Sequence, residues 1–437
     1  MADFLLYTCR FIPAPAGQRP LEHERLDELM SLFVVLLGSG STYVKNPYLR
    51  AKFVEVLRHW LPGDADDPKG RFNPKMAGLF EAHPLALAHL VPALLRLYVD
   101  IEFTGAHTQF YDKFNIRYQI GEIAEYLWKV EPHRRAWAAM AVADEPFYTR
   151  FLNMLINDAI YLLDESIKKL PEVREYDAET ADQEVWLARP ARERSEREAA
   201  YRQSERALRS DLMLANVHVR MMGYTSRDIA APFLLPEMVE RVAAMLNYFL
   251  LFLAGPKRRE LKVKDPEKYG WNPRELLGMI ADVYLHLYAA DHAGAFVAAI
   301  VADGRSYRDE VFVETATVLR ALGLKSEHQI GRFEELAERA RLCAAAAEEE
   351  EADLGEVPDD FLDPILSTLM RDPVKLPSGV SVDRAIITRH LLGAQTDPFN
   401  RQPLSVEDLV DDTELKGRIE AWVAERHTAA SDARMEQ

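Results

Sequence analysis

Helical periodicity is the feature of this sequence that most limits its fold. From Leu21 to about Ala345 the apolar residues recur every three or four positions, and one such series runs from Leu26 to Leu37. This spacing places apolar side chains in one stripe along a helix. Breakers such as Asn46-Pro47 separate the runs, and alternating β-branched residues are scarce. We therefore predict a mainly α protein in which roughly ten or more helices stack as an armadillo-like array, without a fixed repeat length.

The composition changes abruptly after Cys343. Four alanines are followed by eight acidic residues and no basic residue between Glu348 and Asp360. Crowded like charges favour a solvated, weakly structured connector. Alanine and glutamate also form helices well, so the frayed end of a long helix is an alternative. We predict a helical core at 1–345, an acidic linker at 346–356, a compact module at 357–428 and a flexible tail at 429–437.

The module that begins at residue 357 has signals for short strands as well as helices. Two strand-like runs, Pro373–Leu376 and Val380–Val382, flank Pro377-Ser378-Gly379, which is typical of a hairpin turn. Asp383 is placed to cap a helix that runs to Leu392. A last amphipathic helix carries four apolar residues on one face, namely Leu415, Ile419, Trp422 and Val423. We predict a small α+β domain.

Charge and cysteine content exclude several classes of protein. The 53 basic and 70 acidic residues give a net charge of −17, which repels nucleic-acid phosphates and anionic membranes, so we expect no nucleic-acid partner. Two cysteines, Cys9 and Cys343, can form neither a disulfide framework nor a multi-cysteine zinc cluster, and they suit a reducing compartment. The twelve histidines are scattered without a metal-binding spacing. We expect no metal and no cofactor.

No segment predicts membrane insertion or export. The most apolar stretch, Met245 to Ala254, contains Asn247 and is about half the ~20 residues that a membrane helix needs. The N-terminus has neither the basic start nor the long apolar segment of a signal peptide. We expect a soluble protein that stays inside the cell.

The sequence has no convincing acid–base or nucleophilic centre of its own. Gly38-Ser39-Gly40 continues neither as a phosphate loop nor as a dinucleotide fingerprint, and we expect a turn there. Cys343 lies close to carboxylates that disfavour its thiolate, so we expect it to be a bystander.

Residues 189–209 are dense in arginine and glutamate. Pairs such as Arg192 with Glu196 are spaced to bond along one helix, although each contributes only ~0.2–0.5 kcal/mol. We expect a solvated helix or a mobile excursion, and a binding surface is the alternative.

Several motifs follow one another in the C-terminal module. They are Phe361-Leu362-Asp363-Pro364-Ile365, Leu369-Met370-Arg371-Asp372-Pro373-Val374, Leu376-Pro377-Ser378-Gly379, Asp383-Arg384, His390-Leu391 and Asp397-Pro398-Phe399-Asn400-Arg401. In that order and spacing, from Val357 to about His427, the module resembles the U-box, the zinc-free relative of the RING domain of ubiquitin ligases. A RING holds its two loops with cysteine and histidine ligands to zinc, which this chain cannot supply. The resemblance therefore implies loops held by packing, turns and hydrogen bonds.

The upstream helices carry motifs of one family with such a module. Among them are Asn46-Pro47-Tyr48-Leu49, Phe110-Tyr111-Asp112-Lys113-Phe114, Asn153-Met154-Leu155-Ile156-Asn157-Asp158 and Asp265-Pro266-Glu267-Lys268-Tyr269-Gly270. They resemble segments of the ubiquitin conjugation factors, which elongate ubiquitin chains, and the resemblance runs over nearly the whole chain. Members of that family are longer, and this chain begins inside their helical core. Contacts made through the family's N-terminal region, such as those with ubiquitin-receptor shuttles, are therefore not expected here.

The resemblance implies a U-box ubiquitin ligase. It would move ubiquitin from the cysteine of a charged conjugating enzyme to a lysine of a pre-ubiquitinated substrate, without a covalent intermediate of its own. Its contribution would be to dock the conjugating enzyme and orient the thioester toward the amine. The alternative is a non-catalytic helical-repeat adaptor in the ubiquitin–proteasome pathway.

The resemblance also implies which residues contact the conjugating enzyme. These are apolar residues of two loops and the helix between them, namely Ile365, Leu366, Leu391, Pro398 and Phe399. Arg401 matches the linchpin arginine of the family, whose planar donors bridge carbonyls of the conjugating enzyme and ubiquitin. An ion pair between Arg401 and Asp397 is the alternative role.

Other residues of the module are expected to hold its loops. Ser378-Gly379 would make the tight turn, Asp383 would cap the helix, and Asn400 or Arg384 would bond loop backbone. The remaining structural residues implied by the U-box pattern are Pro364, Pro373, Pro398 and Asp397; the prolines would stiffen the loops.

The implied partners are the charged conjugating enzyme, ubiquitin and ubiquitinated substrates. The family also suggests a hexameric ubiquitin-selective AAA ATPase, a segregase, to which no residue can be assigned. We expect the protein in the cytoplasm and nucleus, in protein quality control, ERAD and proteasomal degradation.

Overall fold

A computed structural model of the chain describes residues 2–11, 25–40, 42–63, 72–103 and 110–435. The predicted start of the helical region at Leu21 lies outside these residues. The chain divides into two compact units. The first comprises Met1–Ile229 and Arg259–Met279, and the second comprises Ala230–Arg258 and Ile280–Gln437.

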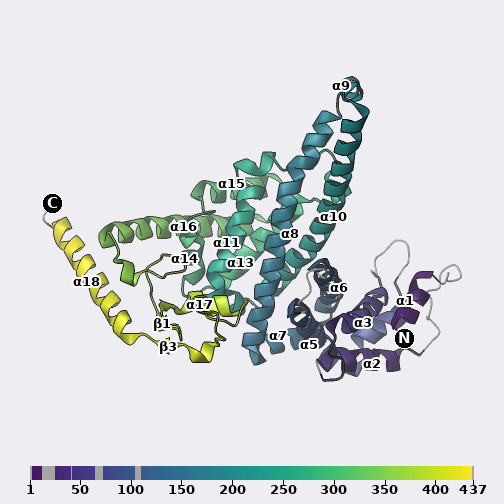
Figure 1. Ribbon diagram of the computed structural model, residues 1–437, viewed down its shortest axis with the longest axis horizontal. Coiled ribbons are helices and arrows are strands. Elements are labelled where there is room, and N and C mark those ends of the chain that lie inside the picture. The colour runs from purple at the N-terminus through teal and green to yellow at the C-terminus, as the bar shows by residue number, and fades with distance from the viewer. Residues whose placement is uncertain (1, 12–24, 41, 64–71, 104–109, 436–437) are drawn as a thin grey trace. The chain divides into compact units, whose positions relative to one another are not determined.

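The first unit is built from helices (Figure 1). They are α1 (Ala2–Phe11), α2 (Asp27–Gly38), α3 (Pro47–His59), α4 (Pro74–Glu81), α5 (Pro84–Asp100), α6 (Phe110–Lys129), α7 (Glu131–Ala143), α8 (Glu145–Glu179), α9 (Gln183–Ala188), α10 (Ala191–Asp228) and α12 (Pro266–Tyr269). α13 (Pro273–Ala290) begins in this unit and ends in the second. Short 3-10 helices occur at Ile101–Phe103, Ala231–Leu234, Pro256–Arg259, Asp359–Phe361 and Val406–Asp408.

Local chemistry explains where these helices start and which face they bury. The predicted break at Asn46-Pro47 is confirmed, because the Asn46 side chain accepts a hydrogen bond from the Tyr48 N–H at 2.9 Å and Pro47 is the first residue of α3. In α2 the predicted apolar stripe is also confirmed, with Met30 and Phe33 among its buried residues. The helical array therefore follows from periodicity and caps along the chain.

The helices α8 and α10 form a long hairpin, with α9 between their ends (Figure 1). No described residue between 174 and 207 is buried, so the arginine-rich stretch is a solvated helix, as predicted. Arg192 pairs with Glu196 along α10 at 2.8 Å. Arg197 instead bonds Glu179 across the hairpin at 3.1 Å. Charge thus joins the two helices where little apolar surface is buried.

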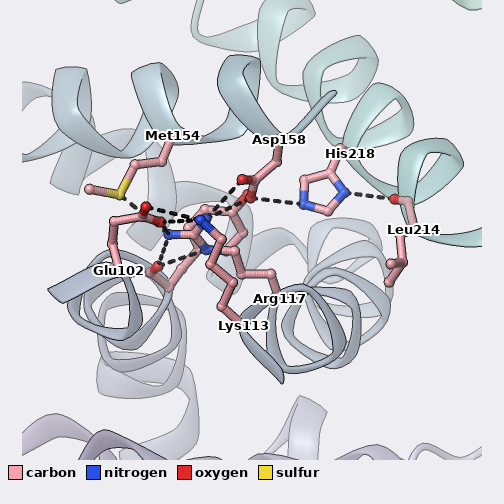
Figure 2. A network of polar contacts seen from close by, with 8 residues as sticks. Glu102, Lys113, Arg117, Met154, Asp158, Leu214 and His218 are labelled. Carbon is pink, nitrogen blue, oxygen red and sulfur yellow. Dashed lines mark hydrogen bonds and ion pairs between the residues drawn. The ribbon is translucent and has the colours of Figure 1, made fainter. Parts of the chain in front are cut away.

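A buried ionic network lies in the core of the first unit (Figure 2). The side chain of Arg117 is fully buried and donates to both Asp158 oxygens at 2.9 and 2.8 Å. It also donates twice to the Tyr98 carbonyl, at 3.1 and 3.0 Å, and pairs with Glu102 at 2.8 Å. The His218 ring lies 3.4 Å from the Asp158 carboxylate. The network joins α5, α6, α8 and α10.

The ionisation of Asp158 depends on this network. Burial by itself raises the pKa of Asp158, but the positive charge of Arg117 and the contact with His218 outweigh it and lower that pKa to about 2. The Asp158 carboxylate is therefore charged in the core.

The second unit contains the remaining helices and all three described strands. Its helices are α11 (Pro236–Leu253), α14 (Ala295–Ala302), α15 (Asp309–Ala321), α16 (Glu327–Leu354), α17 (Arg384–Leu391) and α18 (Thr413–Met435). Its strands are β1 (Pro373–Lys375), β2 (Ser381–Asp383) and β3 (Val410–Asp411). Asn247, the polar residue in the most apolar stretch, is buried, donates to the Ile300 carbonyl at 2.9 Å and accepts from the Tyr284 hydroxyl at 2.7 Å.

The predicted hairpin is confirmed as the centre of an antiparallel sheet with strand order β2-β1-β3. Val374 pairs with Val382 on one side and with Asp411 on the other. One apolar cluster lies against the sheet and comprises Val374, Leu376, Val382, Ile387, Leu391 and Leu404. A second cluster comprises Phe361, Met370, Leu415 and Ile419, against which Trp422 and Val423 pack, as the face predicted for α18 requires. The C-terminal module is the predicted small α+β domain.

The structure differs from the expected edges of this module, and at the first edge it shows the alternative, the end of a long helix. Helix α16 continues to Leu354, so most of the predicted acidic linker, 346–356, is helical. The helix propensities of alanine and glutamate prevail because each like-charge pair costs only a few tenths of a kcal/mol. Helix α18 likewise continues to Met435, so residues 429–435 of the predicted flexible tail, 429–437, are helical.

No single helix in the described parts of the chain is long and apolar enough to cross a membrane, although α4 and α5, bent by 73°, pass that test as a pair.

Candidate functional site

The first loop of the C-terminal module is organised by Asp363, whose side chain is buried. Its Oδ1 accepts hydrogen bonds from the N–H groups of Ile365 and Leu366 at 2.8 and 2.9 Å. Its backbone carbonyl accepts from the Ser367 N–H at 2.7 Å, and its own N–H donates to the Thr368 carbonyl at 2.7 Å. One aspartate thus orders the whole loop.

The second loop repeats this arrangement around Asp397, which is also buried. Its Oδ1 accepts from the N–H groups of Phe399 and Asn400 at 2.9 and 3.4 Å. Its carbonyl accepts from the Arg401 N–H, and its N–H donates to the Gln402 carbonyl, each at 2.8 Å. Burial raises the pKa of Asp397, but hydrogen bonds from Phe399 and the hairpin turn outweigh it and lower that pKa below its usual value.

The two loops also share a backbone conformation that most residues avoid. Ser367 and Arg401, each four positions after its aspartate, have φ values of 57° and 62°. This left-handed conformation costs a non-glycine residue roughly 1–2 kcal/mol. In both loops the hydrogen bonds to the aspartate hold the backbone in this conformation.

The second oxygen of each aspartate attaches its loop to the β1–β2 hairpin. The Oδ2 of Asp363 accepts from the Asp383 N–H at 2.8 Å, at the end of β2. The Oδ2 of Asp397 accepts from the Ser378 N–H at 3.1 Å, in the hairpin turn. That turn is closed by Gly379, which has a φ of 83° and donates to the Leu376 carbonyl at 2.8 Å. Both loops are therefore fixed to one rigid element.

Asp383 connects the first loop to helix α17. Its Oδ1 accepts from the Ala385 N–H at 3.1 Å, which confirms the predicted helix cap. Its Oδ2 accepts from the N–H groups of Arg371 and Asp372 at 2.7 and 3.1 Å. Three backbone amides, from two segments, meet on this carboxylate.

Of Asn400 and Arg384, either of which was expected to bond loop backbone, Asn400 is the one that does so. Asn400 accepts from the Gln402 N–H at 2.9 Å, inside the loop. Arg384 instead pairs with the carboxylates of Asp372, at 2.6 Å, and Asp411. Hydrogen bonds from Lys416 and Arg384 lower the pKa of Asp372. Arg384 therefore holds β3 and the start of β1 together.

The loops expose three large apolar side chains. Ile365, Leu366 and Phe399 are 41%, 45% and 43% exposed. Pro398 is half-buried beside Phe399, and Pro364 is exposed. Apolar groups held outward by an ordered backbone suit a docking surface.

Leu391 and Pro373 are buried. Leu391 is only 6% exposed and belongs to the apolar cluster against the sheet. It supports the module from within, so its predicted direct contact with the conjugating enzyme is corrected. Pro373 is the first residue of β1.

The Arg401 side chain is exposed at the end of the second loop. The alternative role, an ion pair with Asp397, is not seen, because both Asp397 oxygens accept backbone amides and Arg401 has no ion pair among the described residues. Its guanidinium is therefore available to a partner.

Asp363 is the functional residue that sequence reasoning missed. The Asp-Pro dipeptide occurs twice, as Asp363-Pro364 and Asp397-Pro398, and this repetition could have indicated two loops with the same arrangement of hydrogen bonds. No group of three or more metal-ligating side chains occurs among the described residues. In these loops, buried carboxylates take the ordering role that metal ligands have elsewhere.

Comparison with known families assigns the chain to a class. The ubiquitin elongating factor core matches residues 1–341, and the U-box domain matches residues 357–428. The chain therefore belongs to the ubiquitin elongating factor family and carries a U-box, which confirms the resemblance seen in its motifs.

Three relatives illustrate the similarity. The chain is 48% identical to a probable ubiquitin conjugation factor E4 of Arabidopsis thaliana, over 95% of this chain and 40% of that protein. It is 37% identical to the E4 ubiquitin-protein ligase UFD2 of Saccharomyces cerevisiae, over 95% of this chain and 43% of that protein. It is also 37% identical to the ubiquitin conjugation factor E4 of Schizosaccharomyces pombe, over 91% of this chain and 39% of that protein. The chain thus spans about two-fifths of the length of these relatives.

Proposed function

We propose that this chain is a U-box ubiquitin ligase that elongates ubiquitin chains on pre-ubiquitinated substrates. The observation that carries the proposal is the pair of aspartate-anchored loops, which hold Ile365, Leu366 and Phe399 outward on one hairpin. The names of the relatives, a ubiquitin conjugation factor and a ubiquitin-protein ligase, support it.

The chemistry needs no nucleophile from this chain. A lysine amine of the acceptor attacks the thioester carbonyl that joins ubiquitin to the conjugating-enzyme cysteine. The new C–N bond replaces the C–S bond, the conjugating-enzyme cysteine leaves as the thiolate, and the proton lost by the amine passes to solvent. The loops bind the conjugating enzyme and restrict its tethered ubiquitin, which is an orientation effect.

Arg401 is placed to stabilise the oriented state. Its planar guanidinium can donate to carbonyls of both the conjugating enzyme and ubiquitin, and its backbone is fixed by Asp397. A non-catalytic adaptor would not need, beside the docking loops, an arginine that has no ion pair within the described part of the chain.

Calorimetry with a ubiquitin-conjugating enzyme tests the docking surface. Ile365→Ala should weaken binding by ~1–2 kcal/mol, because it removes an apolar anchor. Val406→Ala, at a residue 48% exposed in a 3-10 helix outside the loops, is the matched control and should bind normally. Unchanged affinity of Ile365→Ala, across a panel of conjugating enzymes that bind the unmodified chain, would remove this residue from the interface.

We further propose action in the cytoplasm and nucleus, in protein quality control, ERAD and proteasomal degradation, with a ubiquitin-selective segregase as a partner. The two cysteines suit a reducing compartment. Imaging of a fluorescent fusion tests the location, and co-purification from cells tests the segregase.

A further inference from the structure

A short segment of chain connects the U-box to the preceding helix of the second unit. Between α16 and the 3-10 helix at Asp359–Phe361 lie residues 355–358. Gly355 has φ 64° and ψ −143°, a conformation that is strained for other residues. Short connections with a glycine at the helix end allow domains to change orientation, and such motion is the default unless contacts oppose it.

The first opposing contact joins helix α17 of the U-box to α11. Arg389 lies 3.5 Å from Glu240, and the two side chains are 22% and 52% exposed. The next residue, Arg241, is partly buried and its Nε has no hydrogen-bond partner among the described residues. Burial and the charge of Arg389 lower the pKa of Arg241. Arg389 is thus attracted by one neighbour and repelled by the next.

The second contact joins the end of α18 to α16. Arg434 bonds Glu349 at 2.9 Å and Asp353 at 2.5 Å, two acids one helical turn apart. Arg434 lies beyond the U-box match, which ends at residue 428. The helical continuation of α16 and α18 is what brings these groups together.

The two contacts have complementary effects. Each is a partly exposed ion pair, so each is weak and is screened by salt. They lie on different helices of the U-box, α17 and α18, so together they oppose its rotation about residues 355–358, which neither could do alone.

We propose that Arg434 and Arg389 are positioning residues, which hold the U-box in one orientation on α11 and α16 so that a docked conjugating enzyme keeps a fixed direction relative to these two helices. The effect of this orientation on ubiquitin transfer rests on the proposed function, whereas the orientation of the U-box itself does not depend on that function.

Distance measurement tests the orientation directly. In the full chain, with Cys9 and Cys343 replaced by serine, spin labels go on Val313→Cys in α15 and Val410→Cys in the U-box, residues that are each 64% exposed. The parent should give one narrow distance distribution, and Arg434→Glu should broaden it. The triple variant Arg434→Glu, Glu349→Arg, Asp353→Arg should narrow it again.

The matched control is Arg341→Glu, which makes the same charge change on α16 at a residue that pairs with Glu338 of its own helix. It should leave the distribution narrow. An unchanged distribution in Arg434→Glu, or a triple variant that stays broad, would overturn the proposal.

The α11–α17 contact needs a different substitution. Arg389→Glu would meet Arg241 and form a new attraction, so the clean change is Glu240→Arg, which sets three arginines against one another. It should broaden the same distances, and adding Arg389→Glu should restore them. If Glu240→Arg leaves the distances narrow, this contact has no positioning role.

Two activity readouts separate positioning from folding. Arg434→Glu should leave discharge of a charged conjugating enzyme to free lysine unchanged, because the docking loops are intact. It should slow elongation on a ubiquitinated substrate by roughly threefold to tenfold, since part of the proximity effect is lost. Loss of both activities would show a folding defect and overturn the positioning role. Absence of discharge in the unmodified chain would refute the proposed function, while the distance measurement would still decide the orientation.

Discussion

Asp363 and Asp397 each concentrate in one side chain the bonds that order an entire loop. Each accepts two loop amides with one oxygen and a hairpin amide with the other. A buried carboxylate is tolerated there because its acceptors are paired with donors. Single substitutions at these positions should therefore affect a whole loop.

Asp397→Asn should loosen the second loop selectively. The amide keeps one acceptor but turns a donor toward the Ser378 N–H, which leaves both groups unpaired at a cost of ~1–3 kcal/mol. Hydrogen exchange should show faster exchange at Ser378 and Phe399. Asp408→Asn, in the exposed cap of a 3-10 helix, is the control that should leave those amides protected. Equal protection of these two amides in Asp397→Asn would contradict the role of the carboxylate.

At Arg401 the role of the side chain can be tested separately from that of the loop backbone. Because its φ is 62°, Arg401→Gly accommodates the loop conformation and removes the side chain, whereas Arg401→Ala keeps the strain that Arg401 already has. We expect Arg401→Gly to dock the conjugating enzyme normally and to discharge it at least about tenfold more slowly, a difference of ~1.4 kcal/mol in the barrier. Arg401→Lys should not restore the rate, because it lacks the planar donors. A normal discharge rate for Arg401→Gly would refute the linchpin role.

At the scale of the elements, the buried carboxylate of Asp158 links helices of the first unit. The carboxylate of Asp158 receives bonds from α5 and α6 and lies beside His218 of α10. Replacing one member of a buried ion pair leaves the other as an uncompensated buried charge. This costs far more than replacing all members of the pair by apolar residues.

The depressed pKa of Asp158 predicts an acid-sensitive first unit. Its value of about 2 lies below the ordinary 3.8, so the stabilisation is fully present above pH 4 and is lost as the pH falls through 2. The difference corresponds to about 2 kcal/mol. Hydrogen exchange of α6 and α8 amides at pH 2 to 5 should show this loss, and Asp158→Asn should flatten the dependence.

Asp164→Asn is the matched control, because Asp164 lies on α8 in an exposed pair with Lys168. The acid sensitivity should persist in that variant. If the Asp158→Asn variant keeps the full pH dependence, other carboxylates are responsible for the acid sensitivity.

At the scale of the whole molecule, the proposed ligase should work without a metal. The loops are ordered by carboxylates and amides, so discharge of a previously charged conjugating enzyme should continue at the same rate in strong chelators. Charging the enzyme beforehand removes the need for magnesium and ATP in the assay. Loss of discharge after chelation, reversed by added zinc, would show a metal requirement.

Much of the array and of the site could be predicted from the sequence because it depends on local patterns. The stripe of α2, the Asn46 cap, the Ser378-Gly379 turn and the Asp383 cap each involve residues within a few positions of one another. The U-box match likewise follows from motifs in order along the chain.

Other features were predicted wrongly or missed because they depend on distant partners. Leu391 is apolar and lies next to the loops, but only the packed cluster decides that it points inward. Arg384 could have bonded loop backbone, and the position of β3 brought Asp411 to it instead.

The sequence by itself therefore determined the helical class, the hairpin, the caps and the family, because periodicity and turn chemistry act over a few residues. The tertiary structure alone decided that Arg434 reaches Glu349 and Asp353. It also decided that Asp363 joins its loop to Asp383. These outcomes depend on contacts across tens of residues, where small opposing free energies are resolved only once the segments are packed together.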